Sequence, residues 1–182
     1  MRITGGRARS RRLSAPRGQQ TRPTAERVRE ALFSILGPPP TEARVLDLFA
    51  GAGTLGLEAL SRGAEFAVFV DQSRSAAKFI RLNVHALELD ASSRVHCGDV
   101  LRVVPGLDGA FDWIFIDPPY ATDLADRTLE LLGSGDFLAD GCVVIVENDR
   151  RQPAARAAGC LVKVDCRRYG DTELSFYRES SG

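Results

Sequence analysis

Short apolar runs alternate with amphipathic stretches over most of the chain. The runs predict buried strands over Val45–Phe49, Phe66–Val70, Arg94–Cys97, Trp113–Ile116 and Cys142–Val146. The stretches around them repeat apolar residues every three or four positions and predict helices over Thr24–Leu36, Leu55–Ser61, Ser73–Leu87 and Leu124–Leu132. Strands that take turns with helices indicate a mostly parallel sheet covered on both faces, the doubly wound α/β class.

The pattern changes at the two ends of the chain. Residues Leu161–Cys166 and Leu174–Arg178 predict two further strands, joined by a connection too short for a helix, so we expect an antiparallel hairpin and seven strands in all. Residues Arg2–Leu13 predict a basic hairpin that turns at Gly5-Gly6. We divide the chain into an N-terminal arm, residues 1–40, and a body, residues 41–182, on which the arm should pack.

Charge is distributed unevenly between arm and body. The whole chain has no net charge, but its first 29 residues contain nine arginines and one glutamate, which leaves +8 there and −8 on the remainder. Clustered guanidinium groups attract a phosphate backbone and release its counterions. The arginines we expect to contact such a polyanion are Arg2, Arg7, Arg9, Arg11, Arg12, Arg17 and Arg22.

A mitochondrial or chloroplast transit peptide would also be basic and poor in acidic residues. Gly5-Gly6, Pro16, Gly18 and Pro23 would break the amphipathic helix that such a peptide needs, so we favour an arm that binds a polyanion. The longest apolar runs, such as Cys142–Val146, are five residues long, against the roughly 18 of a membrane span. We therefore expect a cytoplasmic monomer without a membrane partner.

The four cysteines, at positions 97, 142, 160 and 166, show no CxxC spacing. Without such closely spaced pairs, the cysteines do not suggest a zinc site. We expect the cysteines to be small core residues in a reducing compartment, and we expect no metal.

Candidate ligand contacts follow the ends of the strands, because ligands of open parallel sheets bind beyond the carboxyl ends of the strands. Gly51 and Gly53 open a helix and let a ligand approach the backbone closely. Asp71 follows the second strand, 20 residues after Gly51, where a carboxylate can accept hydrogen bonds from a ribose. Because Gly56 completes a G-x-G-x-x-G pattern, the glycines alone leave a nicotinamide dehydrogenase open.

The segment Asp117-Pro118-Pro119-Tyr120 follows the fourth strand and favours a different chemistry. The prolines fix the backbone and lack N–H donors, so the carbonyl groups and the Asp117 carboxylate present only acceptors. Such acceptors suit an exocyclic amine, whose two hydrogens the Asp117 side chain and the Pro118 carbonyl can hold. The Tyr120 ring can stack on a nucleobase.

These motifs resemble those of the RsmD-type bacterial enzymes. The cofactor loop Phe49-Ala50-Gly51-Ala52-Gly53, the Asp-Pro-Pro-Tyr segment and the entry Arg22-Pro23-Thr24 carry the resemblance, which extends from the first residues to about Tyr177. It implies a Rossmann-like class I methyltransferase fold and methylation of a guanine N2 amine with S-adenosylmethionine. The implied partner is 16S ribosomal RNA or a small-subunit assembly particle.

The resemblance also implies roles for individual residues. The implied catalytic residues are Asp117, Pro118, Pro119 and Tyr120. The implied cofactor contacts are Asp47, Phe49, Ala50, Gly51, Gly53, Asp71, Asp99 and Val100. Among them, Asp71 would hold the ribose, Asp99 the adenine amine and Asp47 the methionine ammonium.

Two other functions share parts of this pattern. A DNA adenine-N6 or cytosine-N4 methyltransferase can use the Asp-Pro-Pro-Tyr segment, but such enzymes usually carry a target-recognition domain, for which no insertion in this chain is long enough. A non-catalytic RNA-binding protein on the same fold would have no need of the motifs at Gly51, Asp71 and Asp117. Binding of S-adenosylmethionine would distinguish an RNA methyltransferase from the non-catalytic binding protein, and binding of a dinucleotide would instead reveal a nicotinamide dehydrogenase.

Overall fold

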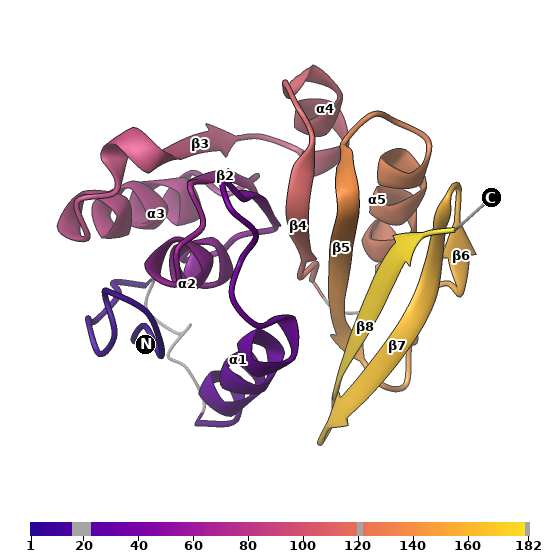
Figure 1. The fold of residues 1–182 in the computed structure, drawn as a ribbon, viewed down its shortest axis with the longest axis horizontal. Coiled ribbons are helices and arrows are strands. Elements are labelled where there is room, and N and C mark those ends of the chain that lie inside the picture. Colours follow the sequence, from indigo (N-terminus) through magenta and orange to yellow (C-terminus); the bar gives the residue numbers. More distant parts are fainter. Residues whose placement is uncertain (16–22, 120–121, 181–182) are drawn as a thin grey trace.

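The computed structural model describes residues 1–15, 23–119 and 122–180, and of residues 23–25 only the backbone (Figure 1). The helices are α1 (Pro23–Leu36), α2 (Thr54–Ser61), α3 (Arg74–Ala86), η1 (Asp90–Ser92), α4 (Val100–Val103), η2 (Val104–Gly106) and α5 (Leu124–Gly133). The strands are β1 (Arg44–Leu48), β2 (Phe66–Asp71), β3 (Ser93–Cys97), β4 (Phe111–Ile116), β5 (Leu138–Asp149), β6 (Ala157–Ala158), β7 (Leu161–Tyr169) and β8 (Thr172–Glu179). No helix of this described part is long and apolar enough to cross a membrane.

The strands form one sheet in the order β3-β2-β1-β4-β5-β8-β7-β6. Neighbours from β3 to β5 are parallel, and β8, β7 and β6 continue the sheet in antiparallel pairs. The predicted α/β class and C-terminal hairpin are confirmed. The predicted number of strands is wrong, because the sheet has eight. The additional strand, β6, has only two residues, too few to show a hydrophobic period.

Helices cover the central strands on both faces (Figure 1). Residues of α1, α2 and α3 pack on one face against side chains such as Phe115 and Ile145. Residues of α4 and α5 pack on the other face against Ile116 and Val146. Successive side chains of a strand point to opposite faces, so strands covered on both sides are apolar at every position. This double burial explains the continuous apolar runs in the sequence.

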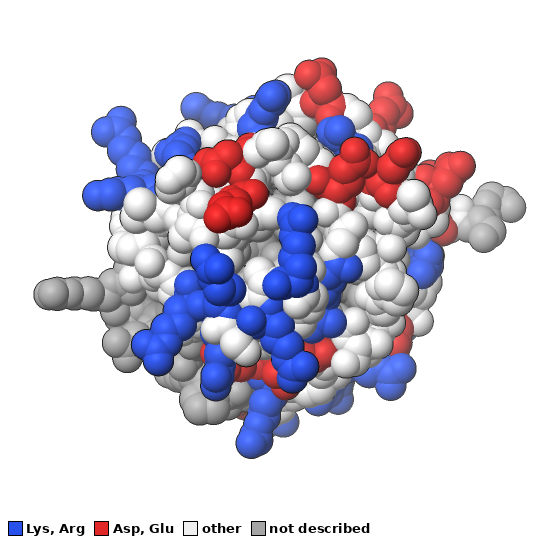
Figure 2. All heavy atoms as spheres, turned by 60° about the vertical axis from the view of Figure 1, so that its left-hand side comes forward, with Lys and Arg blue, Asp and Glu red and all other residues white. Residues whose placement is uncertain are grey.

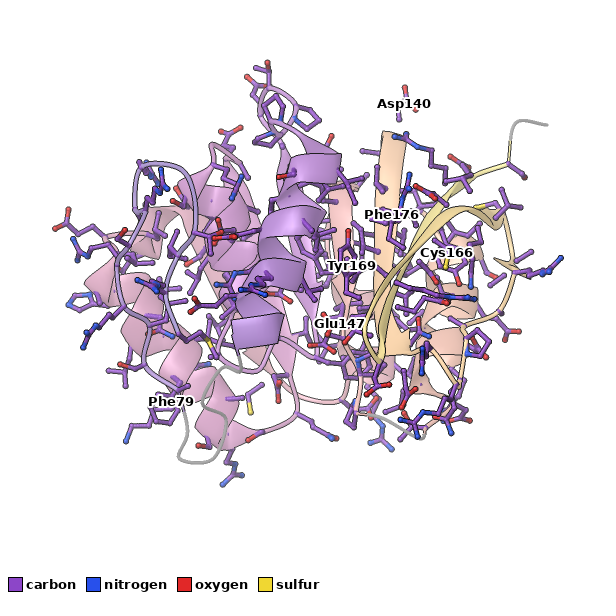
Figure 3. All side chains as sticks on the ribbon, turned by 90° about the horizontal axis from the view of Figure 1, so that it is seen from below. Phe79, Asp140, Glu147, Cys166, Tyr169 and Phe176 are labelled. Atoms are coloured by element: carbon purple, nitrogen blue, oxygen red, sulfur yellow. The ribbon has the colours of Figure 1, made fainter. Side chains whose placement is uncertain are left out.

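Strand β5 is longer than the apolar run that predicts it. The run ends at Val146, but the strand extends from Leu138 to Asp149. Its polar ends carry Asp140 and Glu147, which lie at opposite ends of the strand in Figure 3. Only the middle of the strand is covered on both faces and therefore apolar. The hydrophobic pattern does not extend to strand ends whose side chains face solvent or a ligand site.

The cysteines differ in burial. Cys142 is buried, as expected of a core residue, but Cys97 and Cys166 are exposed and Cys160 is partly exposed. The prediction of core positions is therefore wrong for these three. They lie in β3, at the edge of the sheet, and in or beside β7, where one side of the strand faces solvent.

The N-terminal arm is a compact loop docked on the body. Its first residues run antiparallel to residues 11–13 and form one bridge, Arg2 with Arg12, while the predicted turn at Gly5-Gly6 widens to residues 5–10. Ile3 and Leu13 are buried in the core that α1 shares with the sheet. The arm thus packs on the body as expected. The prolines and glycine between Pro16 and Pro23 predict a loop, of which residues 16–22 lie outside the described residues, while Pro23 opens α1.

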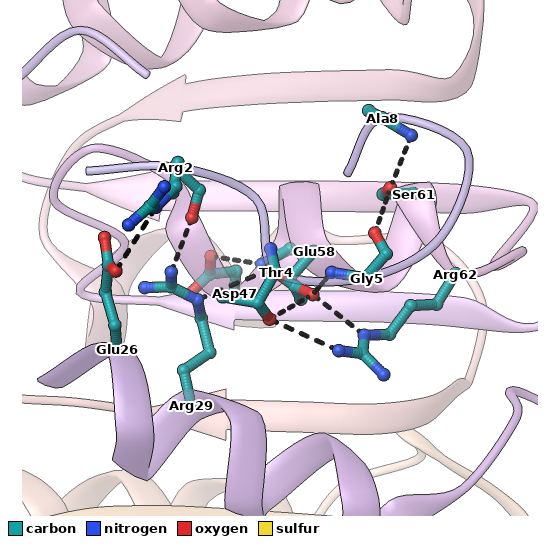
Figure 4. A network of polar contacts seen from close by, with 11 residues as sticks. Arg2, Thr4, Gly5, Ala8, Glu26, Arg29, Asp47, Glu58, Ser61 and Arg62 are labelled. Carbon is teal, nitrogen blue, oxygen red and sulfur yellow. Dashed lines mark hydrogen bonds and ion pairs between the residues drawn. The ribbon is translucent and has the colours of Figure 1, made fainter. Parts of the chain in front are cut away.

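A buried carboxylate on α2 holds the arm in place (Figure 4). Glu58 is fully buried, and its oxygens accept hydrogen bonds from the backbone N–H of Thr4 at 2.8 Å, the Thr4 hydroxyl at 2.7 Å and the backbone N–H of Gly5 at 2.7 Å. Arg62 pairs with it at 2.8 Å, and Arg29 of α1 lies 3.4 Å away. Glu58 therefore joins the arm, α1 and α2.

Ser61, one turn further along α2, fixes the next residues of the arm. Its hydroxyl donates to the Gly5 carbonyl at 2.7 Å and accepts from the Ala8 N–H at 2.9 Å. Its own carbonyl accepts from the Arg7 N–H at 2.8 Å. The backbone of the arm between residues 4 and 8 is therefore satisfied largely by one helix.

Replacing Glu58 tests this anchor. Glu58→Ala leaves the buried Arg29 without its carboxylate and two backbone N–H groups of the arm without an acceptor. We expect the free energy of unfolding, measured in urea, to fall by about 3–5 kcal/mol. The matched control is the exposed Glu65, for which Glu65→Ala should change stability by less than about 0.5 kcal/mol. Equal losses in the two variants would contradict the anchoring role.

Candidate active site

The loop between β1 and α2 is tightly folded and open on one side. Phe49, Gly51 and Gly53 have positive φ angles of 59°, 57° and 77°. A positive φ costs glycine little but strains a residue as bulky as Phe49. A Cβ added at Gly51 would meet no atom within 4 Å, so there is free space beside the backbone. Gly53 begins α2 without a side-chain cap, which leaves N–H groups of the first turn available.

The third glycine of the pattern serves packing. A Cβ on Gly56 would lie 2.4 Å from Cε1 of Phe69 on β2, so only glycine allows α2 to lie this close to the sheet. The Gly56 N–H donates to Asp47 Oδ2 at 2.8 Å. Gly56 therefore fixes the helix on the sheet, and the open side of the loop is at Gly51.

Asp71, at the end of β2, supports the loop with both carboxylate oxygens. Oδ2 accepts from the Gly51 N–H and Oδ1 from the Ser73 N–H, each at 2.8 Å. A carboxylate oxygen has a second lone pair, and Asp71 is partly exposed. The same side chain that orders the loop can thus still accept hydrogen bonds from a ligand.

A small hollow next to this loop brings together residues from three strand ends. It is lined by Phe49, Gln72, Asp99, Val100, Leu101 and Leu124. Three of them, Phe49, Asp99 and Val100, are among the residues expected to contact a cofactor. The sequence could have identified Gln72 as a lining residue, because it directly follows Asp71 at the end of the second strand. Nothing in the sequence points to Leu101 or Leu124 as lining residues. Asp99 also caps α4, where Oδ1 accepts from the Arg102 N–H at 3.2 Å.

Three carboxylates lie in a row at the carboxyl ends of β1, β4 and β5. Asp47 is paired with Phe115 of β4. Ile116 of β4 is paired with Val146 of β5, and the next residue on each side is a carboxylate, Asp117 and Glu147. Each of the three stands two positions after a strand residue that packs on the face of the sheet covered by α1, α2 and α3. Because side chains alternate between the two faces, all three carboxylates are directed to that same face. Sequence reasoning missed Glu147, because the apolar run ends one residue before it.

All three carboxylates have raised pKa values. Burial, only partly offset by the Gly56 hydrogen bond, raises the pKa of Asp47 to about 7. The surrounding protein, together with the negative charges of Glu147 and Asp47, raises the pKa of Asp117 well above its ordinary value. Asp117 is itself exposed, and solvent on that side moderates the rise. Burial also raises the pKa of Glu147, and the nearby Arg29 charge lowers it.

The two prolines after Asp117 differ in their surroundings. Pro118 is buried and Pro119 is exposed. The Pro119 carbonyl accepts from the Thr122 hydroxyl at 2.9 Å, which holds the following turn. Tyr120 lies outside the described residues, so its stacking role stays a prediction.

Asn83 of α3 links the arm to the cofactor loop. It is buried, and its amide nitrogen donates to the carbonyls of Ala52 at 3.0 Å and Ser14 at 2.9 Å, while its oxygen accepts from the Ser14 N–H at 2.7 Å. A polar residue on the apolar face of α3, beside Ile80 and Val84, is the signal in the sequence that could have identified it.

The first five arginines of the arm are on the surface. Arg2, Arg7, Arg9, Arg11 and Arg12 are all exposed. Figure 2 brings this side of the molecule forward and shows basic side chains spread across its lower half. Arg2 pairs with Glu26 at 3.5 Å, and Arg11 donates to the Ala86 carbonyl at 2.7 Å. Arg17 and Arg22 lie outside the described residues.

Comparison with known families and sequences gives a consistent result. The family model described as Conserved hypothetical protein 95 matches residues 1–178. The YlbH protein of Bacillus subtilis is 35% identical over 182 residues, 98% of this chain and 99% of its own length. Ribosomal RNA small subunit methyltransferase D of Escherichia coli K12 is 36% identical over 149 residues, 82% of this chain and 75% of its own length.

Solved structures agree with this result. The yhhF protein of Escherichia coli has a TM-score of 0.86 and 31% identity, covering 100% of this chain and 99% of its own. A protein of Thermus thermophilus, TTHA0928, has a TM-score of 0.79 and 33% identity, covering 97% of this chain and 98% of its own. The class I methyltransferase fold expected from the sequence is thereby confirmed.

The raised pKa of Asp47 predicts how stability depends on pH. In the unfolded chain Asp47 loses its proton near the ordinary aspartate value of 3.8, but in the folded protein its pKa is about 7, so the folded state holds the additional proton between these values. Its contribution to stability is therefore present at low pH and is lost as the pH rises through this window. In Asp47→Asn, the fall in unfolding free energy between about pH 5 and pH 8 should be smaller than in the wild type by about 2–3 kcal/mol.

The exposed Asp136 provides the control, since Asp136→Asn should keep the wild-type pH dependence. Unfolding free energy will still depend on pH in all the variants, because the surrounding protein raises the pKa values of Asp117 and Glu147 as well. An Asp47→Asn protein whose stability follows the wild-type pH curve would show that Asp47 titrates as an ordinary carboxyl.

Proposed function

Because this chain belongs to the RsmD family, described as Conserved hypothetical protein 95, we propose that it methylates the exocyclic N2 amine of a guanine in 16S ribosomal RNA with S-adenosylmethionine. The observation that carries the proposal is the Asp117 carboxylate at the end of β4, next to the open glycine loop. The specific target that we propose is guanine 966.

The residues around the glycine loop fit S-adenosylmethionine. The free space beside Gly51 admits a ligand, and Asp71 retains lone pairs for two ribose hydroxyls. The hollow lined by Phe49 and Val100 suits a flat adenine, whose amine can donate to Asp99. When bound, the cofactor supplies an activated methyl group. Asp47 is almost fully buried below the loop, so we assign it to support of α2.

Asp117 would act on the target amine. The lone pair of a guanine amine is delocalised into the ring, which makes the nitrogen a poor nucleophile. Acceptors that hold its two hydrogens favour a pyramidal nitrogen, whose lone pair is then available for methyl transfer. The Asp117 carboxylate and the Pro118 carbonyl are the acceptors that we assign to this task. The methylated nitrogen is more acidic and must lose a proton. A carboxylate with a raised pKa, such as Asp117, is well suited to take it.

The arm supports RNA as the substrate class. Its exposed arginines face solvent next to the body, in which 15 basic and 22 acidic residues leave a net charge of −7. Relatives named as ribosomal RNA small subunit methyltransferases point to the same substrate. A target base must leave its stack at a cost of a few kcal/mol, which phosphate contacts to the arm can offset. We therefore retain residues 1–40 as an RNA-binding arm and residues 41–182 as the catalytic body.

Two substitutions separate cofactor binding from chemistry. Asp71→Ala should weaken S-adenosylmethionine binding by about 1–3 kcal/mol, roughly ten- to a hundredfold in dissociation constant, because the ribose acceptor is lost. Asp117→Ala should abolish turnover and leave that dissociation constant nearly unchanged. Calorimetry measures the binding, and transfer of a labelled methyl group measures the turnover.

Since Asp71 also orders the glycine loop, each variant is first compared with the wild type in thermal unfolding. Wild-type affinity in Asp71→Ala, or wild-type turnover in Asp117→Ala, would contradict the assigned role of that residue.

Neutralising part of the arm tests the RNA contact. The triple change Arg7→Gln, Arg9→Gln and Arg12→Gln removes exposed charges that make no ion pair within the described residues. RNA affinity should fall. In a plot of log affinity against log salt concentration, the line should become less steep by about 0.7–0.9 for each lost phosphate contact. Cofactor affinity should stay unchanged.

A control with the same change in charge uses arginines elsewhere on the surface. Replacing Arg127, Arg151 and Arg156, all exposed on the body, by glutamine should leave the salt slope within the error of the wild type. If both triple variants lost the same affinity, net charge rather than the arm would attract the RNA.

A further inference from the structure

Glu147 is a carboxylate at the site with no role in the chemistry described so far. It lies near the end of β5, within the sheet, and is only partly buried. Its side chain makes no hydrogen bond or ion pair to any other residue in the described part of the chain. A carboxylate that the fold leaves unpaired beside an active site is available to a ligand.

The sheet places Glu147 next to Asp117. Ile116 and Val146 are directly paired on the parallel strands β4 and β5, and these two acidic residues are the next along each chain. Both follow residues of the same face, Phe115 and Ile145, by two positions, and so they are directed to the same side of the sheet. The charge of Glu147 also raises the pKa of Asp117, as expected of close neighbours.

The positive group that acts on Glu147 makes its contacts with other residues. Arg29 of α1 lowers the pKa of Glu147, but its Nη2 donates to the Arg2 carbonyl at 2.6 Å, and its buried Nε lies 3.4 Å from Glu58 without a hydrogen bond. Asp47, on the far side of Asp117, adds a third negative charge when it is ionised. Within the described residues, the site therefore presents two adjacent acceptors, Asp117 and Glu147, and no donor that is hydrogen-bonded to Glu147.

Among the bases with an exocyclic amine, guanine alone has a second donor beside it. Its N2 amine is adjacent to N1–H, whereas the amines of adenine and cytosine stand next to a ring nitrogen that only accepts. Two adjacent carboxylates thus match the hydrogen-bonding edge of guanine and repel that of the others.

We propose that Glu147 accepts the N1–H of the target guanine while Asp117 holds its N2 amine, so that Glu147 selects guanine. The inference rests on the proposed function and names a specificity-determining residue for it. A site built around a substrate N–H discriminates strongly against an analogue that lacks it, because the buried acceptor is then left unpaired.

The test uses an RNA fragment in which 2-aminopurine replaces the target guanine. This base keeps the amine at C2 but has a lone pair at N1 in place of N1–H. In single-turnover methylation at mildly alkaline pH, the wild type should prefer guanine by at least about tenfold. In Glu147→Gln the amide can donate to the bare N1, so the preference should disappear or reverse. Glu147→Ala, which offers neither acceptor nor donor, should bring the ratio close to one.

Asp140→Asn is the control, since Asp140 is exposed at the opposite end of the same strand, and it should keep the wild-type ratio (Figure 3). The ratio of the two rates, rather than either rate, is the measurement, because a loss of folded protein lowers both rates equally. An unchanged ratio in both Glu147 variants would overturn the inference and leave guanine methylation standing. No methyl transfer to guanine by the wild type would overturn the proposed function and the inference with it.

Discussion

Glu58 must have its charge satisfied inside the protein, because no water reaches it. The donors that satisfy it come from three segments far apart in the sequence: the backbone of the arm, Arg29 of α1 and Arg62 at the end of α2. The cost of leaving this carboxylate unpaired therefore ties the arm to the helix that begins at the cofactor loop. Asn83 adds a second connection, from Ser14 to Ala52 in that loop.

This arrangement explains how one small body can combine a basic arm with an acidic site. The arginines between positions 2 and 12 stay on the surface because the backbone of this segment, rather than its charged side chains, makes most of the docking contacts. The carboxylates of the site stay close together because strand register, rather than attraction, sets their positions. The protein around them raises their pKa values, and for Asp117 the charges of Glu147 and Asp47 raise the pKa further, a property that proton-accepting sites commonly use.

The sequence predicts the parts of the fold that depend on burial. Continuous apolar runs identify β1, β2, β4 and the middle of β5, since these strands are covered on both faces. The rule that ligands bind at strand ends identifies Gly51, Asp71 and Asp99 in the same way. Pattern reasoning fails where a segment is short or polar, as for β6 and the ends of β5, and this failure hides Glu147. It also fails for Glu58 and Asn83, whose roles depend on residues more than 50 positions away.

The most direct test of the account is to find where the methyl group goes. Purified protein, labelled S-adenosylmethionine and small-subunit ribosomal RNA from a strain deleted for this gene are incubated together, and the RNA is digested to nucleosides for mass spectrometry. We expect the label to be recovered as N2-methylguanosine from a single site. Label in N6-methyladenosine or N4-methylcytidine, or no transfer to RNA by protein that binds the cofactor, would contradict it.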